Sequence, residues 1–325
     1  MSSHQGTSRV VGCAGILVAD TICGPLPEMP AEGSLVAVDD MPVKVGGCAA
    51  NVAIDLVRQG ADVGLLGCLG DDAGADVVTK TLVEAGIDTS ALIRKPGTPT
   101  SKTVILLIEG QDRRFIHTFG ANAVMTAADL APAWLEQLAV FYLGGLFALP
   151  GIESAALVPV LEFCRSRGIT TVLDVVISED FNRTDDLRLL LPHTDYFLPN
   201  DDEAAIITGT REPTDQVAAL ADWGTGTVII TCGGDGSVAH RDGTTYRSAA
   251  HHFNVVDTSG CGDAFASGLI VGMLEDWDLP RMLQYASAIG ASATQATGTT
   301  DGVWDRATAE AFAQKHPLTQ ETMER

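Results

Sequence analysis

The segment with the clearest chemical potential spans residues 257–268, where glycines and an aspartate open a helical pattern of small residues. Gly260 and Gly262 would let backbone N–H groups converge on one point. Such a nest at a helix N-terminus binds anions and stabilises charge on a phosphoryl group in transfer. Asp263 would lie in the first helical turn, where it could accept a proton from an attacking hydroxyl. A glycine-rich turn in which Asp263 only favours the helix dipole explains the segment equally well.

Two further segments place polar side chains beside tight turns. Gly46 and Gly47 would allow close approach of a ligand, and Asn51 on the following helix could hydrogen-bond its hydroxyls. Asn200 and Glu203 are three residues apart and face one way at a helix start, where their oxygens suit Mg²⁺ and its waters. Each segment also has a purely structural explanation, a tight turn for Gly46–Asn51 and a helix cap for Asn200–Glu203.

Other segments narrow the class of chemistry. Residues 231–236 follow a buried strand pattern and could border a nucleotide or form a plain turn, and Asp20 could hold two hydroxyls or cap a turn. The chain has no G-x-x-x-x-G-K-[ST] stretch, which excludes a P-loop, and no G-x-G-x-x-G that opens a helix after a strand. A nicotinamide-dependent dehydrogenase therefore has little support.

The elements that must position these residues alternate along the chain. Apolar runs predict strands at 10–18, 63–69, 141–143, 170–174, 196–198 and 227–231. Helical patterns cover 49–59, 73–85, 151–167, 185–191 and 213–223, and then 260–274, 279–296 and 305–315. This β-α alternation predicts a mostly parallel sheet with helices on both faces.

Two segments interrupt the alternation. Residues 24–45 contain four prolines and a short strand-like run at 35–38, and another strand-like run at 253–256 leads into the 257–268 motif. Residues 101–118 read as a hairpin with strands at 102–108 and 113–118. We expect inserted segments of about 21–45 and 99–120 to form a small β lid, although edge strands of the main sheet would give the same pattern.

Composition sets limits on partners and location. Hydrophobic residues make up 46% of the 325 residues and charged residues 19%, which fits one large α/β domain over 1–325. The net charge of −22 argues against nucleic-acid binding and against docking on anionic membranes. The seven cysteines include no C-x-x-C pair, and the first nine residues show no signal-peptide core. We therefore expect a cytoplasmic protein with reduced thiols and no membrane span.

A resemblance becomes plain from the order of these motifs. Gly46-Gly47 with Asn51, then Asn200 with Glu203, and then Asp257 to Asp263 resemble the ribokinase family, the PfkB carbohydrate kinases. Residues 46–74 are similar to the first family signature and 257–268 to the second, and the likeness runs from about 10 to 304. It implies a ribokinase-like α/β/α sandwich with a mostly parallel central sheet and a small β lid.

The resemblance also implies roles for individual residues. Asp263 would be the catalytic base, with an anion hole formed by Gly260, Cys261 and Gly262. The groups that would hold the sugar are Asp20, Gly46, Gly47 and Asn51. The residues that would border ATP are Thr231, Gly233, Gly236 and Asn200. Asn200 and Glu203 would place Mg²⁺ through water, and the family offers K⁺ near Asp257 and Ser259 as an option.

This chain departs from the family pattern at two positions. Cys261 stands where the family usually has alanine, and Lys44 precedes the glycine pair rather than following it. The displaced lysine weakens an assignment to ribose.

The sequence thus predicts an ATP-dependent kinase that phosphorylates a hydroxyl of a fructose- or ribose-like monosaccharide. The alternatives are a nucleoside kinase of the adenosine type, a 2-keto-3-deoxygluconate-type sugar-acid kinase that uses Arg113 and Arg114, and a non-catalytic sugar sensor. Because residues 104–108 are apolar at every position, we also expect a homodimer that associates through the lid.

Overall fold

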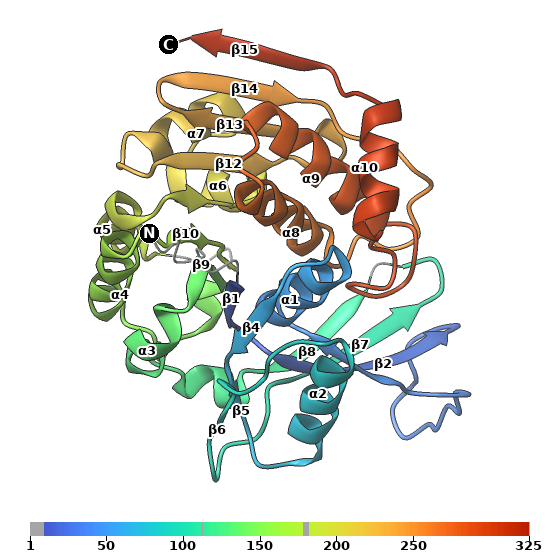
Figure 1. Ribbon diagram of the computed structural model, residues 1–325. Coiled ribbons are helices and arrows are strands. Elements are labelled where there is room, and N and C mark those ends of the chain that lie inside the picture. The colour runs from blue at the N-terminus through green and yellow to red at the C-terminus, as the bar shows by residue number, and fades with distance from the viewer. Residues whose placement is uncertain (1–9, 112, 178–181, 325) are drawn as a thin grey trace.

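A nine-stranded sheet runs through the body of the protein in the computed structural model, which describes residues 10–111, 113–177 and 182–324 (Figure 1). Its order is β15-β14-β13-β12-β11-β10-β9-β1-β4. The six parallel strands are β1 (Val10–Gly15), β4 (Val63–Leu66), β9 (Leu138–Gly144), β10 (Thr170–Leu173), β11 (Tyr196–Phe197) and β12 (Thr227–Thr231). The antiparallel edge consists of β13 (Ser237–Arg241), β14 (Thr244–Ser248) and β15 (Gln320–Glu324).

Helices cover both faces of this sheet. One face packs on α1 (Cys48–Arg58), α2 (Ala73–Glu84), α8 (Cys261–Leu274), α9 (Leu279–Ala293) and α10 (Arg306–Lys315). The other packs on α3 (Pro132–Leu135), α4 (Ser154–Ser166), α5 (Thr184–Leu190), α6 (Asp201–Thr208) and α7 (Pro213–Ala221). Successive strand residues alternate between the two cores: Tyr142 joins the first and Phe141 the second. The sandwich architecture is therefore as predicted.

Small residues bring the site-bearing helix close to its neighbour. Helix α8 is buried over most of its length, and a Cβ at Gly268 would lie 2.7 Å from the Ala286 Cα of α9. Only glycine allows this approach, so the middle of α8 packs closely against α9.

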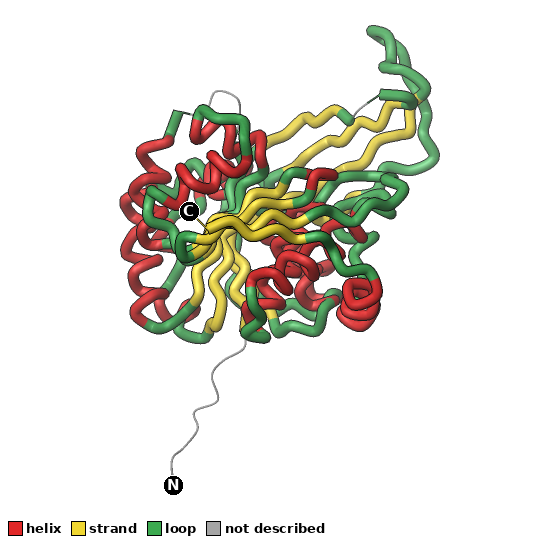
Figure 2. The backbone as a smooth tube through the Cα atoms, turned by 90° about the horizontal axis from the view of Figure 1, so that it is seen from above, coloured by secondary structure: helices red, strands yellow, loops and turns green. Residues whose placement is uncertain are grey.

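The lid is a separate four-stranded sheet, ordered β3-β2-β7-β8. It contains β2 (Val18–Leu26), β3 (Val43–Gly46), β7 (Lys102–Ile108) and β8 (Arg114–Thr118). Figure 2 shows these strands extending beyond the sandwich. The chain enters the lid at Leu17, whose N–H and C=O both bond to the buried Asn122 side chain. These four strands therefore form a sheet of their own and are not edge strands of the main sheet.

Several predicted elements differ from the structure. Residues 10–18 form two strands in different sheets, and 63–69 divide into β4 and β5 (Cys68–Leu69), which pairs with β6 (Ile93–Arg94). Helix α4 begins at Ser154 rather than at 151. The strand-like runs 35–38 and 253–256 are not strands. Conversely, the polar C-terminal segment forms β15 by pairing with β14.

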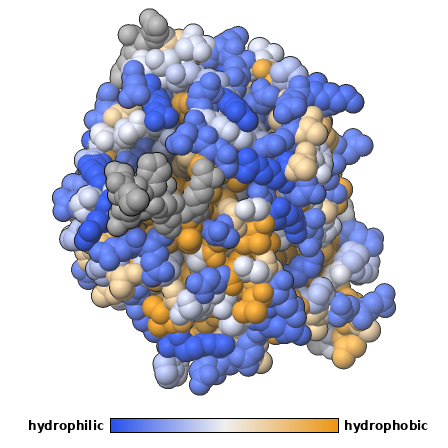
Figure 3. All heavy atoms as spheres, viewed as in Figure 1, coloured by the Kyte–Doolittle hydropathy of each residue, from blue (hydrophilic) through white to orange (hydrophobic). Residues whose placement is uncertain are grey.

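Many of the hydrophobic residues, which make up 46% of the chain, lie in the two cores. On the face shown in Figure 3, hydrophilic residues cover most of the area, and apolar side chains gather in its lower half. Within the described residues, every helix is too short or too polar to cross a lipid bilayer.

Candidate active site

The candidate site lies at the carboxyl ends of the parallel strands, the usual ligand position in open α/β sheets. Asp174 follows β10, Asn200 follows β11, and Thr231 ends β12. These three residues line a cavity of about 200 Å³. Its other polar and glycine lining residues are Cys48, Glu203, Gly260, Gly262 and Asp263. The structure therefore brings together six predicted site residues that are widely separated in the sequence.

Asp263 is held in place by the start of helix α1. Its Oδ2 accepts a hydrogen bond from Asn51 Nδ2 at 2.8 Å, and Thr299 Oγ1 donates to Asn51 Oδ1 at 2.9 Å. Burial raises the pKa of Asp263, while hydrogen bonds from Asn51 and Cys48 lower it. Because the amide of Asn51 is oriented on both sides, it presents its N–H₂ to the carboxylate. Asp263 is thus an oriented carboxylate inside the cavity, a group that is able to accept a proton.

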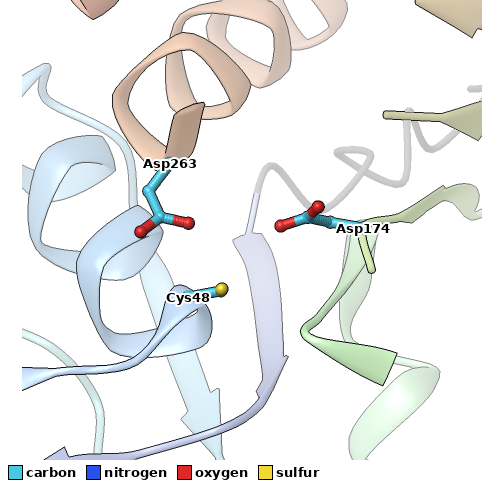
Figure 4. A group of neighbouring side chains, drawn as sticks. All are labelled: Cys48, Asp174 and Asp263. Atoms are coloured by element: carbon cyan, nitrogen blue, oxygen red, sulfur yellow. The ribbon is translucent and has the colours of Figure 1, made fainter. Parts of the chain in front are cut away.

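The sequence reasoning missed two residues that lie beside Asp263. Ligand atoms of Cys48, Asp174 and Asp263 all lie within 4.8 Å of one another, and the three side chains point toward a common space (Figure 4). Tyr142 donates its O–H to Asp174 Oδ2 at 2.7 Å. The apolar pattern of the sequence places Asp174 only at the end of a predicted strand, 170–174. A carboxylate directly after an apolar parallel strand was the available signal.

Burial shifts the pKa values of Cys48 and Asp174. Burial and the charge of Asp263 raise the pKa of the Cys48 thiol well above its ordinary value. The same two causes raise the pKa of Asp174, and the Tyr142 hydrogen bond lowers it. Since Mg²⁺ prefers carboxylate and water oxygens, the thiol is a poor ligand for that ion, while the two carboxylates are suitable.

The turn before α8 has the geometry of an anion cradle. Gly260 is the N-cap in the left-handed region with φ 73°, and a Cβ there would lie 2.1 Å from the Thr299 carbonyl oxygen. A Cβ at Gly262 would meet no atom within 4 Å, so the space in front of its backbone is open. Cys261 is the first residue of α8 and is partly buried. The helix N-terminus can therefore receive an anionic group.

Asn200 and Glu203 form a reciprocal cap at the start of α6. Asn200 Oδ1 accepts from the Glu203 N–H at 2.8 Å, and Glu203 Oε2 accepts from the Asn200 N–H at 3.0 Å. Glu203 Oε1 accepts from the Ile177 N–H at 3.4 Å. Burial raises the pKa of Glu203 to about 7, although these backbone donors lower it. The capping role is present in the structure, and the cavity position leaves the carboxylate available to a hydrated cation.

The predicted sugar-binding residues lie where the lid joins the body. A Cβ at Gly46 would lie 1.9 Å from Asp20 Oδ2, and one at Gly47 would lie 2.4 Å from the Ile16 carbonyl oxygen. Burial raises the pKa of Asp20, and a hydrogen bond from Thr103 lowers it. Thr103 Oγ1 lies 3.0 Å from His117 Nδ1 on the next strand. A polar row thus crosses this face of the lid.

The predicted ATP-bordering glycines lie in the turn between β12 and β13. Gly233 and Gly236 have φ of 53° and 96°, and a Cβ at Gly236 would lie 2.0 Å from the Ser248 carbonyl oxygen. Both are required by the turn itself, whereas Thr231 lines the cavity.

Asp257 connects three segments. Its Oδ1 accepts from the Ser259 N–H at 2.9 Å and its Oδ2 from the Gly298 N–H at 3.0 Å. Arg113 Nη1, in the lid, lies 2.6 Å from Oδ1. Burial would raise the pKa of Asp257, but the two backbone donors and the guanidinium lower it. The carboxylate is therefore charged and already paired with a lid residue.

The comparison with known protein families decides the assignment. The model of the pfkB family carbohydrate kinases matches residues 13–306. This chain belongs to the PfkB family. It is therefore a phosphotransferase that acts on an alcohol group, as the order of the motifs predicted.

Individual relatives are distant but similar in length. The chain is 24% identical to 5-dehydro-2-deoxygluconokinase of Geobacillus kaustophilus over 84% of this chain and 85% of the relative. It is 28% identical to a fructokinase of Escherichia coli, over 87% and 93%. The structure of Arabidopsis thaliana ribokinase complexed with ribose and ATP aligns with a TM-score of 0.81 at 22% identity, covering 95% of this chain and 99% of that one. This last likeness supports the fold.

Proposed function

We propose that this PfkB kinase transfers the γ-phosphoryl group of ATP to a hydroxyl of a monosaccharide, with Asp263 as the base. The observation that carries the proposal is the position of Asp263. Its carboxylate is oriented by Asn51 at 2.8 Å and lies in the first turn of α8, next to the open backbone at Gly262. A hydroxyl placed there would have a proton acceptor and an anion cradle on adjacent sides.

The chain's own groups divide the work. Asp263 accepts the hydroxyl proton, and the N–H groups at Gly260, Cys261 and Gly262 stabilise charge on the phosphoryl oxygens. Mg²⁺ supplied with ATP neutralises phosphate charge. Asn200 and Glu203 would hold that ion through water, because both Glu203 oxygens already accept backbone hydrogen bonds. Thr231, Gly233 and Gly236 would border the nucleotide, with Thr231 the one in the cavity wall.

The lid favours a free sugar as substrate. Asp20, Gly46, Gly47 and Asn51 offer hydrogen-bonding groups and close backbone approach, which suit a polyhydroxyl ligand. Phe115 is exposed, and the exposed Phe119 packs edge-on against His117, so the lid gives a poor stacking clamp for a purine. Arg113 and Arg114 are engaged by Asp257 and Gln111 rather than turned toward a substrate carboxylate. Because Lys44 precedes the glycine pair, we place a fructose-like ketose ahead of ribose among the candidate sugars.

A sugar acid is the second candidate. Among the relatives is 5-dehydro-2-deoxygluconokinase, whose name points to a sugar-acid type of substrate.

The test is ADP production with fructose, ribose, 2-keto-3-deoxygluconate, adenosine and inosine at fixed Mg²⁺. We expect the highest kcat/KM with a free sugar, and a nucleoside that exceeds every sugar would contradict the proposal. Asp263→Asn should lower turnover by about 10²–10⁴-fold while nucleotide still binds. Asp305→Asn, at the cap of α10 and away from the cavity, is the matched control and should retain activity. A protein that binds sugar but releases no ADP would instead be a sensor.

We make three further proposals, on a potassium ion, on the cellular compartment and on the oligomeric state. We retain K⁺ near Asp257 and Ser259 as a prediction, which exchange of potassium for sodium in the same assay tests. We infer a cytoplasmic location from the seven cysteines, all of which are free. We also propose that the chain forms a homodimer through its lid.

A further inference from the structure

The tip of the lid hairpin contacts the loop that precedes the anion cradle. Arg113 lies directly before β8, and its side chain is 24% exposed. Its Nη1 lies 2.6 Å from Asp257 Oδ1, and its Nη2 donates to Thr258 Oγ1 at 3.3 Å. Because a guanidinium is a rigid planar fork, two donors on adjacent residues fix its orientation as well as its distance. The lid is thus attached to residues 257 and 258, immediately before Ser259 and Gly260.

The carboxylate that receives Arg113 also orders two other segments. The Asp257 side chain is only 11% exposed, and it accepts the N–H groups of Ser259 and Gly298. The first bond shapes the turn that leads to Gly260. The second holds the start of the loop 298–303. One carboxylate therefore sets the position of the lid tip, the anion cradle and this loop relative to one another.

The loop 298–303 continues the connection to the catalytic base. Thr299 donates to Asn51 Oδ1 at 2.9 Å, and Asn51 Nδ2 donates to Asp263 Oδ2 at 2.8 Å. The Thr299 carbonyl also lies directly against Gly260. A second lid strand reaches the same loop, since Lys44 Nζ lies 2.5 Å from Asp301 Oδ2. A continuous set of contacts thus runs from the lid to Asp263.

We propose that Arg113 is a positioning residue that couples the closed lid to the catalytic geometry, by fixing Asp257 and, through Gly298 and Thr299, the Asn51 amide that orients Asp263. The inference rests on the proposed function, in which Asp263 is the base. The ion pair aligns the anion cradle and the base together, and without the guanidinium both lose that constraint.

The test compares Arg113→Ala with Arg114→Ala. Arg114 carries the same charge one residue further along the chain, but its partner is Gln111, inside the hairpin. We expect Arg113→Ala to lower kcat about tenfold or more, with the sugar KM changed by less than about twofold, because Arg113 orients the site rather than the sugar. Arg113→Lys should recover part of the loss. Arg114→Ala should behave like the wild type. A raised sugar KM with unchanged kcat would overturn the inference, as it would identify a direct substrate contact.

A double-mutant cycle with Asp257→Asn tests the route. Removing the Arg113 side chain from the Asp257→Asn protein should change kcat by less than about twofold, since the partner is already lost. Additive losses would overturn the coupling. Thermal unfolding shows whether each variant is folded, and Arg113→Gln replaces Arg113→Ala if the alanine variant is not.

Hydrogen exchange separates this inference from the proposed function, because it needs no turnover. Arg113→Ala should increase exchange in residues 102–118 and 257–262, and Arg114→Ala should not. If the wild type phosphorylates none of the panel, the proposed function fails while this comparison still stands. Equal exchange in the two variants would overturn the positioning role.

Discussion

Asp55 is a buried carboxyl group that the proposed chemistry does not use. It lies one helical turn beyond Asn51 in α1 and is 0% exposed. Among the residues that the structure describes, neither of its carboxyl oxygens has a hydrogen-bond partner. Burial, and then the charge of Asp263, raise the pKa of Asp55 well above its ordinary value, and Arg58 lowers it. Its ionised form is therefore disfavoured in the folded protein.

The free energy of unfolding should therefore depend on pH through the carboxyl group of Asp55. A raised pKa in the folded state contributes stability that is complete below the unfolded pKa, about 3.9, and is lost as the pH rises through the folded pKa. Asp55→Asn cannot ionise, so at pH 8 its free energy of unfolding should exceed that of the wild type by about 1–3 kcal/mol. The difference should shrink toward pH 5. Denaturant unfolding at both pH values measures it, with the exposed Asp62→Asn as control. A difference independent of pH would contradict this explanation.

At the scale of elements, the junction of β11 and α6 combines a helix cap with the candidate metal site. The cap bonds of Asn200 and Glu203 use backbone N–H groups, and Glu203 still lines the cavity. Glutamine can accept the same cap hydrogen bond as glutamate, since both are capping-box residues. Glu203→Gln therefore removes the charge and preserves the start of the helix.

We predict that Mg²⁺ dependence follows this charge. Because the pKa of Glu203 is raised to about 7, the carboxylate is increasingly ionised from pH 6 to pH 8. The Mg²⁺ concentration for half-maximal rate should fall over this interval in the wild type. In Glu203→Gln it should be higher and change less with pH. Asp305→Asn removes an acidic charge at the cap of α10, outside the cavity lining, and serves as control. An unchanged titration in Glu203→Gln would argue against the metal role.

The apolar pattern of the sequence predicted the helices and strands that pack in the core. It failed for segments whose structure depends on pairing with another strand. Residues 35–38 are apolar, yet Leu35 is 89% exposed, because prolines flank the run and no neighbouring strand bonds to it within the described residues. Gln320–Glu324 is polar and still forms β15, because β14 offers a free edge. In the site, the spacing of Gly260, Gly262 and Asp263 predicted a helix start, and α8 begins there. The signal at Asp174 was weak, a carboxylate after an apolar strand, because tertiary structure brings that strand end to the cavity.

The outer face of the lid sheet carries exposed apolar side chains. Val43, Thr21, Val104 and Ile116 lie in register across the four lid strands, on the face opposite Asp20, Thr103 and His117. Val43, Val104 and Ile116 are 44%, 37% and 64% exposed. Val104 and Ile116 pair directly, Thr21 of β2 separates Val43 from Val104, and β8 is an edge strand of the lid sheet. Such a surface is an association site unless it is covered.

We therefore predict a lid-to-lid homodimer whose affinity depends on salt. The net charge of −22 makes two copies repel each other, and added salt screens that repulsion, so the dimer dissociation constant should fall as ionic strength rises. Ile116→Glu places a charge in the proposed interface and should yield a monomer with an unchanged fold. Val83→Glu makes the same kind of change at an exposed position on α2 and should remain dimeric. Sedimentation equilibrium at two salt concentrations measures these outcomes. A wild-type monomer at micromolar concentration in high salt would show that the lid face is not a self-association surface.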